Sequence, residues 1–503
     1  MSIAQSQVNQ LVGFLEKYGL LLVLTLYLIF QFFHLGHRWV DDESWYLMPL
    51  PMIFEEGSFR IPTVPGDDVF WPQPPLLTYL EAGFSKVVPL TSYSARLIPL
   101  TFGVLLLIGT YTLCRREFGW LVAVIGTFFV AADNILFLTA RTVRPDIMVA
   151  AFQVFAIMGF LRYREGQEGR LGWLSFSALM AGLAVCSHPN GLLVPLSLLI
   201  CTFLLVTHWP ERIRCALIWG TALALSLLPF AIWMLVLDYE NEFQNVISHW
   251  TGRHGRFADT PESGGLIAQA GALISAEFRG RYSDFIQWPY RIHIGVAALL
   301  GILASLFSKN RVVMTISVIA IAHLLFYIFV NNSNNSIRYL ASMTPLLAIL
   351  YAYWIAGLFG TGAPLKAIAG LLLIVVIGGS QFGGNMLYHW KYRQADYTAV
   401  VDELRRQIPP GSTVYGGMSF WLGLQEYGFV PYMRTDWDQA MQRYRPTHVI
   451  MDDWVMMGGW EDGEWRPLRT RLTQYLEQHG ELVTKVANPF YGDLKLYRVS
   501  YPE

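Results

Sequence analysis

Residues 15–46 of the chain read LEKYGLLLVLTLYLIFQFFHLGHRWVDDESWY. The run 15–35 is apolar and long enough to cross a bilayer, which takes about 20 residues of helix. No small-residue cleavage site follows this run, so it is interpreted as an uncleaved first membrane span. Three consecutive carboxylates, Asp41, Asp42 and Glu43, follow shortly after the span. The chain is therefore expected to open with a membrane helix that ends at an acidic boundary.

The composition extends this interpretation to most of the chain. Only 15% of the 503 residues are charged, against about 25% in soluble proteins, and 54% are hydrophobic. The formal net charge of −1 offers no basic surface for nucleic acid. The predicted fold class is mostly α, a polytopic membrane helical bundle of about eleven spans. The ten apolar runs that follow the first are 93–113, 119–139, 145–163, 171–187, 190–207, 215–237, 291–307, 312–330, 339–359 and 365–383.

Alternate short loops of this bundle are basic, and short basic loops mark the cytoplasmic side of a membrane. The N-terminus is thus expected in the cytoplasm, and the chain is expected to be a multi-pass protein of the plasma (inner) membrane. The long loops 36–92 and 238–290 and the tail are then expected outside. The basic loops carry Arg115 and Arg116, Arg162, Arg164 and Arg170, Arg212 and Arg214, Lys309 and Arg311, and Lys366.

The composition changes after the last span. The segment 397–408 has an apolar helical face, and short apolar runs alternate with helix-like segments after it, which indicates a small α/β domain. Two domains are predicted: a transmembrane module at 1–385 and an extracytoplasmic α/β domain at 386–503. The expected strands are 413–415, 429–433, 447–451, 481–486 and 494–499, with helices at 436–444 and 466–479.

The carboxylates after the first span allow two interpretations. Either they are solvated charges that end the helix, or one of them points into a cavity at the membrane surface. In such a cavity a carboxylate acts as a general base on an acceptor hydroxyl, or binds a divalent cation. Position alone favours neither.

The short outer turn between the third and fourth spans carries Arg141, Arg144 and Asp146. Two arginines in a short outer turn break the charge rule, and such charges at a bilayer boundary are functional candidates. Either Arg144 and Asp146 pair with each other or with lipid headgroups, or an arginine binds a phosphate with its planar fork. His188, in the next outer turn, and Arg338, before the tenth span, share this ambiguity.

Several of these motifs together resemble one enzyme family. They are Asp42-Glu43-x-x-Tyr46 after the first span, the segment PQPPLLTY at 72–79, and the turn 141–146. With the order of the spans, they are similar to the GT-C fold glycosyltransferases, in the branch of the protein O-mannosyltransferases (family 39) and the lipid A aminoarabinose transferase. The resemblance covers the membrane module best.

The resemblance implies roles for individual residues. Asp42 matches the catalytic aspartate, Glu43 lies beside it, and Asp146 matches a second acidic position, so the resemblance predicts all three as catalytic residues. Relatives carry lysines, thought to face phosphate, where this chain has Gln73 and His188, so the phosphate contact is expected to shift to the arginines. The residues predicted to bind the donor and its phosphate are Tyr46, Arg141, Arg144, His188, Arg338 and Tyr339.

The activity implied by the resemblance is transfer of a sugar, a hexose or a pentose, from a polyprenyl-phosphate donor. The acceptor would be a lipid, a glycan or a protein on the outer face, and the reaction would invert the anomeric carbon with an aspartate as general base. No cofactor is expected to be obligatory, although Asp42, Glu43 and Asp146 allow a divalent Mg²⁺ or Mn²⁺ ion. The competing classes are a membrane transporter or channel and a lipid-linked oligosaccharide ligase.

Overall fold

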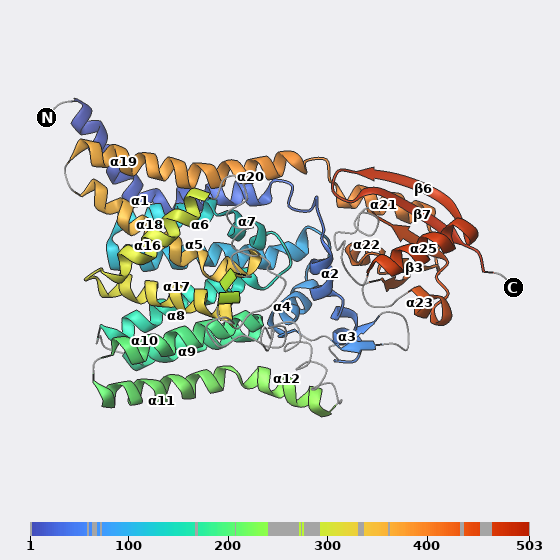
Figure 1. Cartoon of the computed structure of the whole chain (residues 1–503), viewed down its shortest axis with the longest axis horizontal. Coiled ribbons are helices and arrows are strands. Elements are labelled where there is room, and N and C mark those ends of the chain that lie inside the picture. Colours follow the sequence, from blue (N-terminus) through green and yellow to red (C-terminus); the bar gives the residue numbers. More distant parts are fainter. Residues whose placement is uncertain are drawn as a thin grey trace.

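The computed structural model of the chain shows a bundle of helices with a small sheet-containing domain at one end (Figure 1). The predicted fold class, a helical membrane bundle followed by an α/β tail, is confirmed. Most of the predicted outer loop 238–290 lies outside the described residues. The structure describes residues 3–57, 60–62, 68–70, 73–165, 170–206, 208–239, 271–272, 274–275, 292–329, 337–360, 363–432, 437–452 and 465–501.

Every apolar run that the sequence predicts as a span is helical. Apolar side chains on all faces suit helices that lie against lipid or inside a membrane bundle. The helices are α1 (Ile3–Phe32), α5 (Leu97–Phe118), α6 (Trp120–Ala132), α7 (Asn134–Ala140), α8 (Asp146–Arg164), α9 (Arg170–Ser187), α10 (Leu193–Leu205), α11 (Trp209–Ser226), α12 (Leu228–Tyr239), α16 (Ile292–Leu306), α17 (Arg311–Phe329), α18 (Thr344–Phe359), α19 (Pro364–Ile374) and α20 (Ser380–Lys391).

The length of these helices decides how many of them cross the membrane unaided. Among the described residues, six are long and apolar enough to span, or eight if each of two bent helix pairs forms one span. The other three predicted spans are the apolar helices α10, α16 and α18, of 13, 15 and 16 residues. Of the six helices, α8 is the most buried, because 89% of its most apolar stretch is buried inside the protein. It packs against α5 and α9.

Two spans are broken, and each break has a local cause. α6 and α7 meet at 64°, where the Asp133 side chain accepts the backbone N–H groups of Ile135 and Leu136, both at 2.9 Å. This N-cap starts a new helix inside the span. α11 and α12 meet at 50°, just before Pro229, which has no N–H for the carbonyl four residues earlier and whose ring clashes with that carbonyl.

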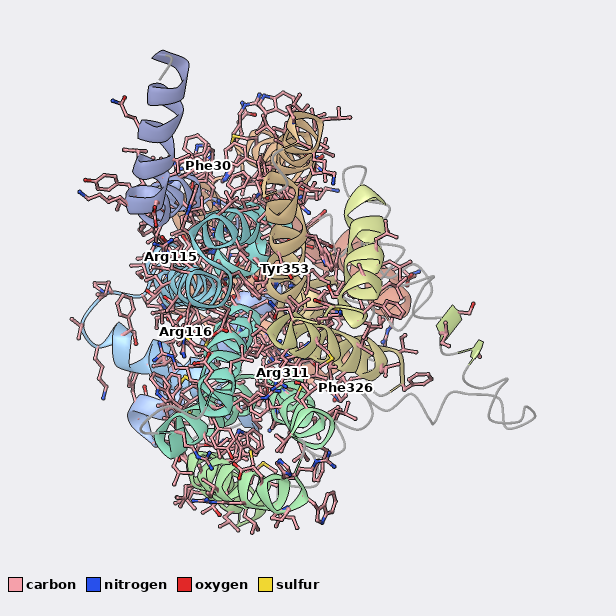
Figure 2. All side chains as sticks on the ribbon, turned by 90° about the vertical axis from the view of Figure 1, so that its left-hand side faces the viewer. Phe30, Arg115, Arg116, Arg311, Phe326 and Tyr353 are labelled. Carbon is pink, nitrogen blue, oxygen red and sulfur yellow. The ribbon has the colours of Figure 1, made fainter. Side chains whose placement is uncertain are left out.

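The two ends of the bundle carry different residues. One end carries the first loop, the turn before α8 and the tail domain, and we call it the outer end after its predicted location (Figure 1). Figure 2 looks onto the opposite end, where Arg115, Arg116 and Arg311 lie. The basic loops thus share one end of the bundle, as the topology requires, and the direction of the bundle in the membrane stays a prediction.

The first loop is largely folded. Pro74 and Pro75 directly precede its longest helix, at a position where the N–H that proline lacks would have no intrahelical partner. Thr78 on that helix donates to the carbonyl of Tyr46 at 3.2 Å, which ties two helices of the loop together. The elements of the loop are α2 (Asp41–Leu47), α3 (Leu50–Glu55), the antiparallel pair β1 (Arg60–Pro62) and β2 (Asp68–Phe70), and α4 (Leu76–Ser85).

The tail domain has a five-stranded mixed sheet in the order β4-β3-β5-β7-β6. β3 pairs in parallel with β4 and β5, whereas β7 pairs antiparallel with β5 and β6. The predicted boundary between residues 385 and 386 falls inside α20, which continues to Lys391. All five expected strands are present: β3 (Thr413–Gly416), β4 (Gly428–Pro431), β5 (His448–Met451), β6 (Gly480–Asn488) and β7 (Gly492–Val499), with α21 (Tyr397–Gln407), α22 (Trp421–Leu424), α23 (Trp437–Arg443) and α25 (Trp465–His479).

Candidate active site

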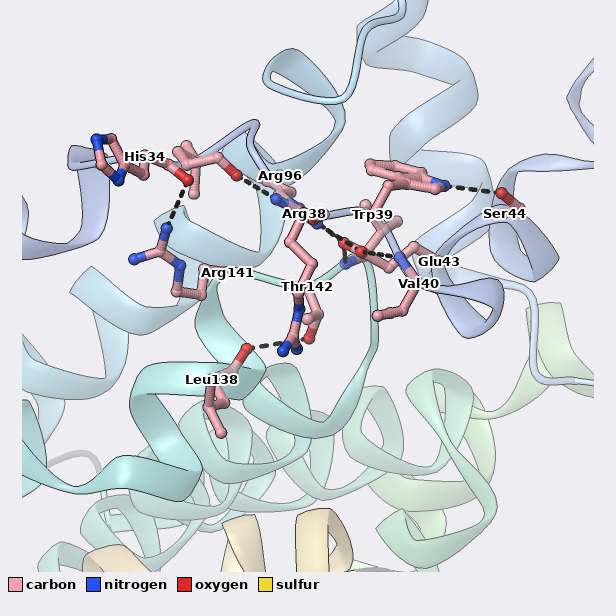
Figure 3. A network of polar contacts seen from close by, with 12 residues as sticks. His34, Arg38, Trp39, Val40, Glu43, Ser44, Arg96, Leu138, Arg141 and Thr142 are labelled. Atoms are coloured by element: carbon pink, nitrogen blue, oxygen red, sulfur yellow. Dashed lines mark hydrogen bonds and ion pairs between the residues drawn. The ribbon is translucent and has the colours of Figure 1, made fainter. Parts of the chain in front are cut away.

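Glu43 holds the start of α2 in place (Figure 3). Its Oε1 accepts Arg96 Nε at 2.7 Å and the backbone N–H of Val143 at 2.9 Å. Its Oε2 accepts Arg96 Nη2 at 2.5 Å and the backbone N–H of Val40 at 3.0 Å. The residue is fully buried, and two charge-assisted and two backbone hydrogen bonds occupy its carboxylate. This arrangement favours a positioning role for Glu43 over the catalytic role that the sequence suggested.

Arg96, which the sequence analysis did not single out, is the centre of this network. It lies in the 3₁₀ turn η1 (Ser94–Arg96) before α5, is 3% exposed, and also donates to the carbonyl oxygens of Leu35 and Arg38. Its guanidinium lies 5.1 Å from the centre of the Trp39 ring. One side chain therefore links the end of α1, the start of α2 and α5. The sequence did contain a signal for Arg96, namely a cation at the outer end of a span. Arg144 and Arg338 were singled out from the same kind of position.

The tail domain contacts the residues just before α2. The backbone N–H of Trp39 donates to Tyr491 Oη at 2.9 Å, and the Tyr491 hydroxyl donates to the Trp39 carbonyl at 2.8 Å. The Trp39 indole N–H donates to Ser44 Oγ at 2.8 Å, and the Tyr397 N–H donates to the His37 carbonyl at 2.9 Å. The tail domain thus supports the segment that carries the acidic residues.

Arg144 and Asp146 form a buried ion pair at the turn before α8. Arg144 Nε donates to Asp146 Oδ2 at 2.9 Å, and the two residues are 6% and 5% exposed. His188 and Arg338 interact electrostatically with the same carboxylate, so three outer turns meet here. The structure therefore shows the pairing that was one interpretation of this turn, and adds an imidazole and a second guanidinium group to it. We call Arg144, Asp146, His188, Arg338 and Tyr339 the Arg144 cluster.

His188 and Tyr339 complete the Arg144 cluster. Their ring centres lie 5.6 Å apart, across the contact between η2 (Pro189–Leu192) and η5 (Ile337–Ser342). His188 Nδ1 accepts the backbone N–H of Asn190 at 3.1 Å, so the neutral imidazole carries its proton on Nε2. Two guanidinium groups and one imidazole interact with the single carboxylate of the cluster, and this excess of possible cations suits an anionic ligand such as a phosphate.

Arg141 is not part of the Arg144 cluster, although the sequence grouped the two arginines. Its guanidinium donates to the carbonyl oxygens of Phe33 at 3.0 Å and His34 at 2.9 Å, and approaches His389 Nε2 to 3.0 Å. These carbonyls follow the last turn of α1, where carbonyl groups lack intrahelical partners and a cation is favourable. Arg141 therefore holds the end of α1 and faces a different group of residues.

Asp42 is the second residue of α2, and its carboxyl group lies outside the described part of the structure. Its backbone is placed by Glu43, whose bond to Val143 brings the first turn of α2 against the turn before α8. Tyr46, one turn further along α2, is 4% exposed. The structure thus sets the Asp42 backbone close to the turn that carries Arg144, and the catalytic role of Asp42 stays a prediction.

The described residues offer few ligands for a metal ion. Within them, no group of three His, Cys, Asp or Glu side chains is arranged to hold a metal ion. The Asp42 carboxyl group was outside that search, and Glu43 is occupied by Arg96. The dependence on a divalent cation therefore stays open to experiment.

Comparison with known proteins adds a family and a fold. A family model described as dolichyl-phosphate-mannose-protein mannosyltransferase matches residues 72–235, from just before α4 into α12. No curated protein sequence matches the chain. The crystal structure of ArnT from Cupriavidus metallidurans bound to undecaprenyl phosphate superposes with a TM-score of 0.63 at 15% identity, over 96% of this chain and 99% of ArnT.

A second solved structure leads to the same fold. The archaeal oligosaccharyltransferase AglB from Archaeoglobus fulgidus, in complex with an inhibitory peptide and a dolichol-phosphate, superposes with a TM-score of 0.55 at 16% identity, over 97% of this chain and 75% of AglB. The chain is thus a polytopic membrane protein with the GT-C glycosyltransferase fold. Within that fold it resembles the protein O-mannosyltransferases and the lipid A aminoarabinose transferase, as its motifs indicated, and these findings support a membrane glycosyltransferase.

Proposed function

We propose that this protein transfers a sugar from a polyprenyl-phosphate donor to an acceptor at the outer face, with inversion at the anomeric carbon. The observation that carries the proposal is the Arg144 cluster, in which the buried Arg144 and His188 and the partly buried Arg338 lie beside the first turn of α2 at the outer end of the bundle. A phosphate at this depth needs cations, because a buried unpaired charge is costly. The apolar helices below the cluster suit an isoprenoid tail.

The structural relatives support a lipid-phosphate donor. ArnT was solved with undecaprenyl phosphate and AglB with a dolichol-phosphate, and this chain shares the fold of both. In the proposed complex, Arg144, Arg338 and His188 hold the donor phosphate. The Asp146 carboxylate fixes the Arg144 side chain through their ion pair.

The proposed chemistry needs one base and one group of cations. The Asp42 carboxylate takes the proton of the acceptor hydroxyl as its oxygen forms a bond to the anomeric carbon. The bond from that carbon to the phosphate oxygen breaks on the opposite face, and the lipid phosphate leaves with the electron pair. Because a phosphate leaves without being protonated, no general acid is required. The transition state resembles an oxocarbenium ion, and the cations stabilise the leaving charge.

The donor site predicts the effect of removing Arg338. Arg338→Gln is expected to raise KM for the polyprenyl-phosphate sugar about tenfold or more, because a hydrogen bond to a charged group contributes roughly 1.5–3 kcal/mol. Steady-state kinetics with a defined donor measure this, and lipid mass spectrometry measures the polyprenyl phosphate that co-purifies. The matched control is Arg115→Gln at the opposite end of the bundle, where Arg115 pairs with Glu16 at 2.7 Å.

The same experiment separates the competing classes. If Arg338→Gln leaves KM and the bound lipid unchanged, the donor phosphate does not bind at the Arg144 cluster. A transporter or channel would carry no polyprenyl phosphate and transfer no sugar. A lipid-linked oligosaccharide ligase would bind the same lipid class, and would transfer a preassembled glycan while rejecting a single sugar.

Transfer is expected to proceed without an added metal ion. The cations of the Arg144 cluster supply the positive charge that a divalent ion would otherwise bring to the leaving phosphate. Activity measured after dialysis against EDTA should therefore equal the activity before it. Loss of activity with the chelator, followed by recovery with Mn²⁺ or Mg²⁺, would contradict this expectation and assign a metal to Asp42 and its neighbours.

A further inference from the structure

A second group of cations lines a cavity at the outer end of the bundle. The cavity lies where the end of α1, the first loop, the turn after α7 and the end of α20 meet. It shares no lining residue with the Arg144 cluster. We call this space the basic cavity, and its cationic and imidazole side chains are Arg38, Arg96, Arg141, His34, His37 and His389.

Positive charge in the basic cavity exceeds negative charge. Among the described residues, three guanidinium groups line it, and Glu43 pairs with one of them, Arg96. The partners of Arg141 are backbone carbonyls and the ring of His389, which satisfy its N–H groups without neutralising its charge. Confined cations with low-dielectric walls concentrate counter-ions, so the cavity attracts an anion.

Aromatic rings hold the Arg38 guanidinium in a position that leaves its N–H groups available to a ligand. Its guanidinium lies 4.8 Å from the ring centre of Tyr388, 5.2 Å from that of Tyr392 and 4.6 Å from that of Phe490 in the tail domain. Cation–π contacts engage the face of the guanidinium, and its N–H groups still lie in its own plane. Three aromatic rings from two parts of the chain thus fix an arginine in the wall of the cavity.

Two histidines, His34 and His37, lie in the wall of the cavity. The rings of His34 and His37 stack with centres 4.2 Å apart, and in the described part of the chain neither buried Nδ1 has a partner. His34 has a φ of 55°, a left-handed conformation that a non-glycine residue rarely adopts without a constraint. Burial of the ring, and to a lesser extent His37 and Arg141, lower the pKa of His34.

From this geometry we propose that the basic cavity binds a phosphate group, with Arg38 as its direct ligand and His34 and His37 beside it. The cavity adjoins the last residues of α1 and α20, at the predicted membrane boundary where lipid phosphates lie. A phospholipid headgroup and free inorganic phosphate offer the same chemistry. This site is additional to the donor site and does not require the proposed transfer reaction.

The test uses the full chain in detergent and three probes. Inorganic phosphate is titrated in a thermal-shift assay, and short-chain phosphatidic acid is titrated by native mass spectrometry, with the matching diacylglycerol as the lipid that lacks a phosphate. Arg38→Gln is expected to weaken binding about tenfold or more, as loss of one charged hydrogen bond does. The matched control is Arg393→Gln, an exposed arginine that donates to the Trp390 carbonyl at 2.7 Å and does not line the cavity.

The probes distinguish the source of the phosphate. Binding of phosphatidic acid alone identifies a lipid headgroup, and stabilisation by inorganic phosphate identifies a free phosphate group. His37→Gln leaves Arg38 on its rings and should weaken binding as well, which keeps the test valid if Arg38→Gln disturbs the tail domain. Arg115→Gln, at the opposite end of the bundle (Figure 2), should bind both probes as the wild type does.

Three results would overturn the proposal. One is equal binding of phosphatidic acid and diacylglycerol together with no effect of inorganic phosphate. Another is wild-type affinity in both Arg38→Gln and His37→Gln. The third is loss of binding in Arg338→Gln alone, because the phosphate would then occupy the Arg144 cluster.

Discussion

Asp42→Asn is expected to abolish sugar transfer in a protein that still folds and binds its donor. Asparagine has nearly the same shape as aspartate and cannot accept the proton of the acceptor hydroxyl. General-base help contributes about 10²–10⁴-fold, so kcat should fall by that factor. KM for the donor should stay near its wild-type value, because the Arg144 cluster, where we propose that the phosphate binds, is unchanged.

The neighbouring carboxylate supplies the control for this prediction. Asp41→Asn removes the same charge one position earlier in α2 and should leave most of the activity. Single-turnover assays with a defined donor and gel filtration of each variant measure transfer and folding separately. Retained activity in Asp42→Asn would remove Asp42 from the mechanism, and an equal loss in Asp41→Asn would attribute the effect to the charge of the acidic segment as a whole.

Arg96→Met is expected to be among the most destabilising single changes in the outer end. The Arg96–Glu43 pair is 3% and 0% exposed, and removal of one partner leaves a carboxylate buried without its counter-charge. Breaking a buried ion pair in this way costs about 3–5 kcal/mol. The double variant Glu43→Gln/Arg96→Met leaves no buried charge, and should recover part of the loss. Thermal unfolding in detergent, monitored by tryptophan fluorescence, measures both.

A surface pair provides the comparison. Arg115 and Glu16 are 40% and 45% exposed, so Arg115→Gln should change the unfolding free energy by about 1 kcal/mol or less. Glu43→Gln alone separates the two roles considered for Glu43. Loss of stability and activity together fits a positioning residue, whereas loss of activity at wild-type stability would return Glu43 to the chemistry. If the Arg96→Met variant were as stable as the wild type, the Arg96–Glu43 pair would not be stabilising the outer end of the bundle.

The membrane bundle was predictable because the apolar composition of each helix is visible in its own stretch of sequence. A run of apolar residues needs no knowledge of its neighbours to be recognised as a span, and the strands of the tail domain gave similar local signals. The folded first loop was less visible, because α2 and α3 have only 7 and 6 residues and depend on packing. Neither break within a span was predicted, because a proline such as Pro229 is tolerated in membrane helices and the Asp133 cap depends on two hydrogen bonds that the sequence does not show.

The site was only partly predictable, because its contacts join distant parts of the chain. Glu43 and Arg96 are 53 residues apart, and no local pattern shows that they meet. Arg141 and Arg144 lie in one turn and looked equivalent, yet the first holds the end of α1 while the second pairs with Asp146. The sequence identified the outer turns that carry the candidate residues, and tertiary packing decided which of their side chains lie together.

The two hydrogen bonds between Trp39 and Tyr491 also bear on the order in which the protein folds during synthesis. The partners are 452 residues apart, so the segment before α2 is synthesised long before the hydroxyl that holds it. Contacts of such separation form late, after the elements between them are in place. When the ribosome has completed every membrane helix, it has therefore still to synthesise the tail domain that supports the acidic segment. We therefore expect the proposed transfer activity to appear only at the end of synthesis, when the tail domain contacts the first loop.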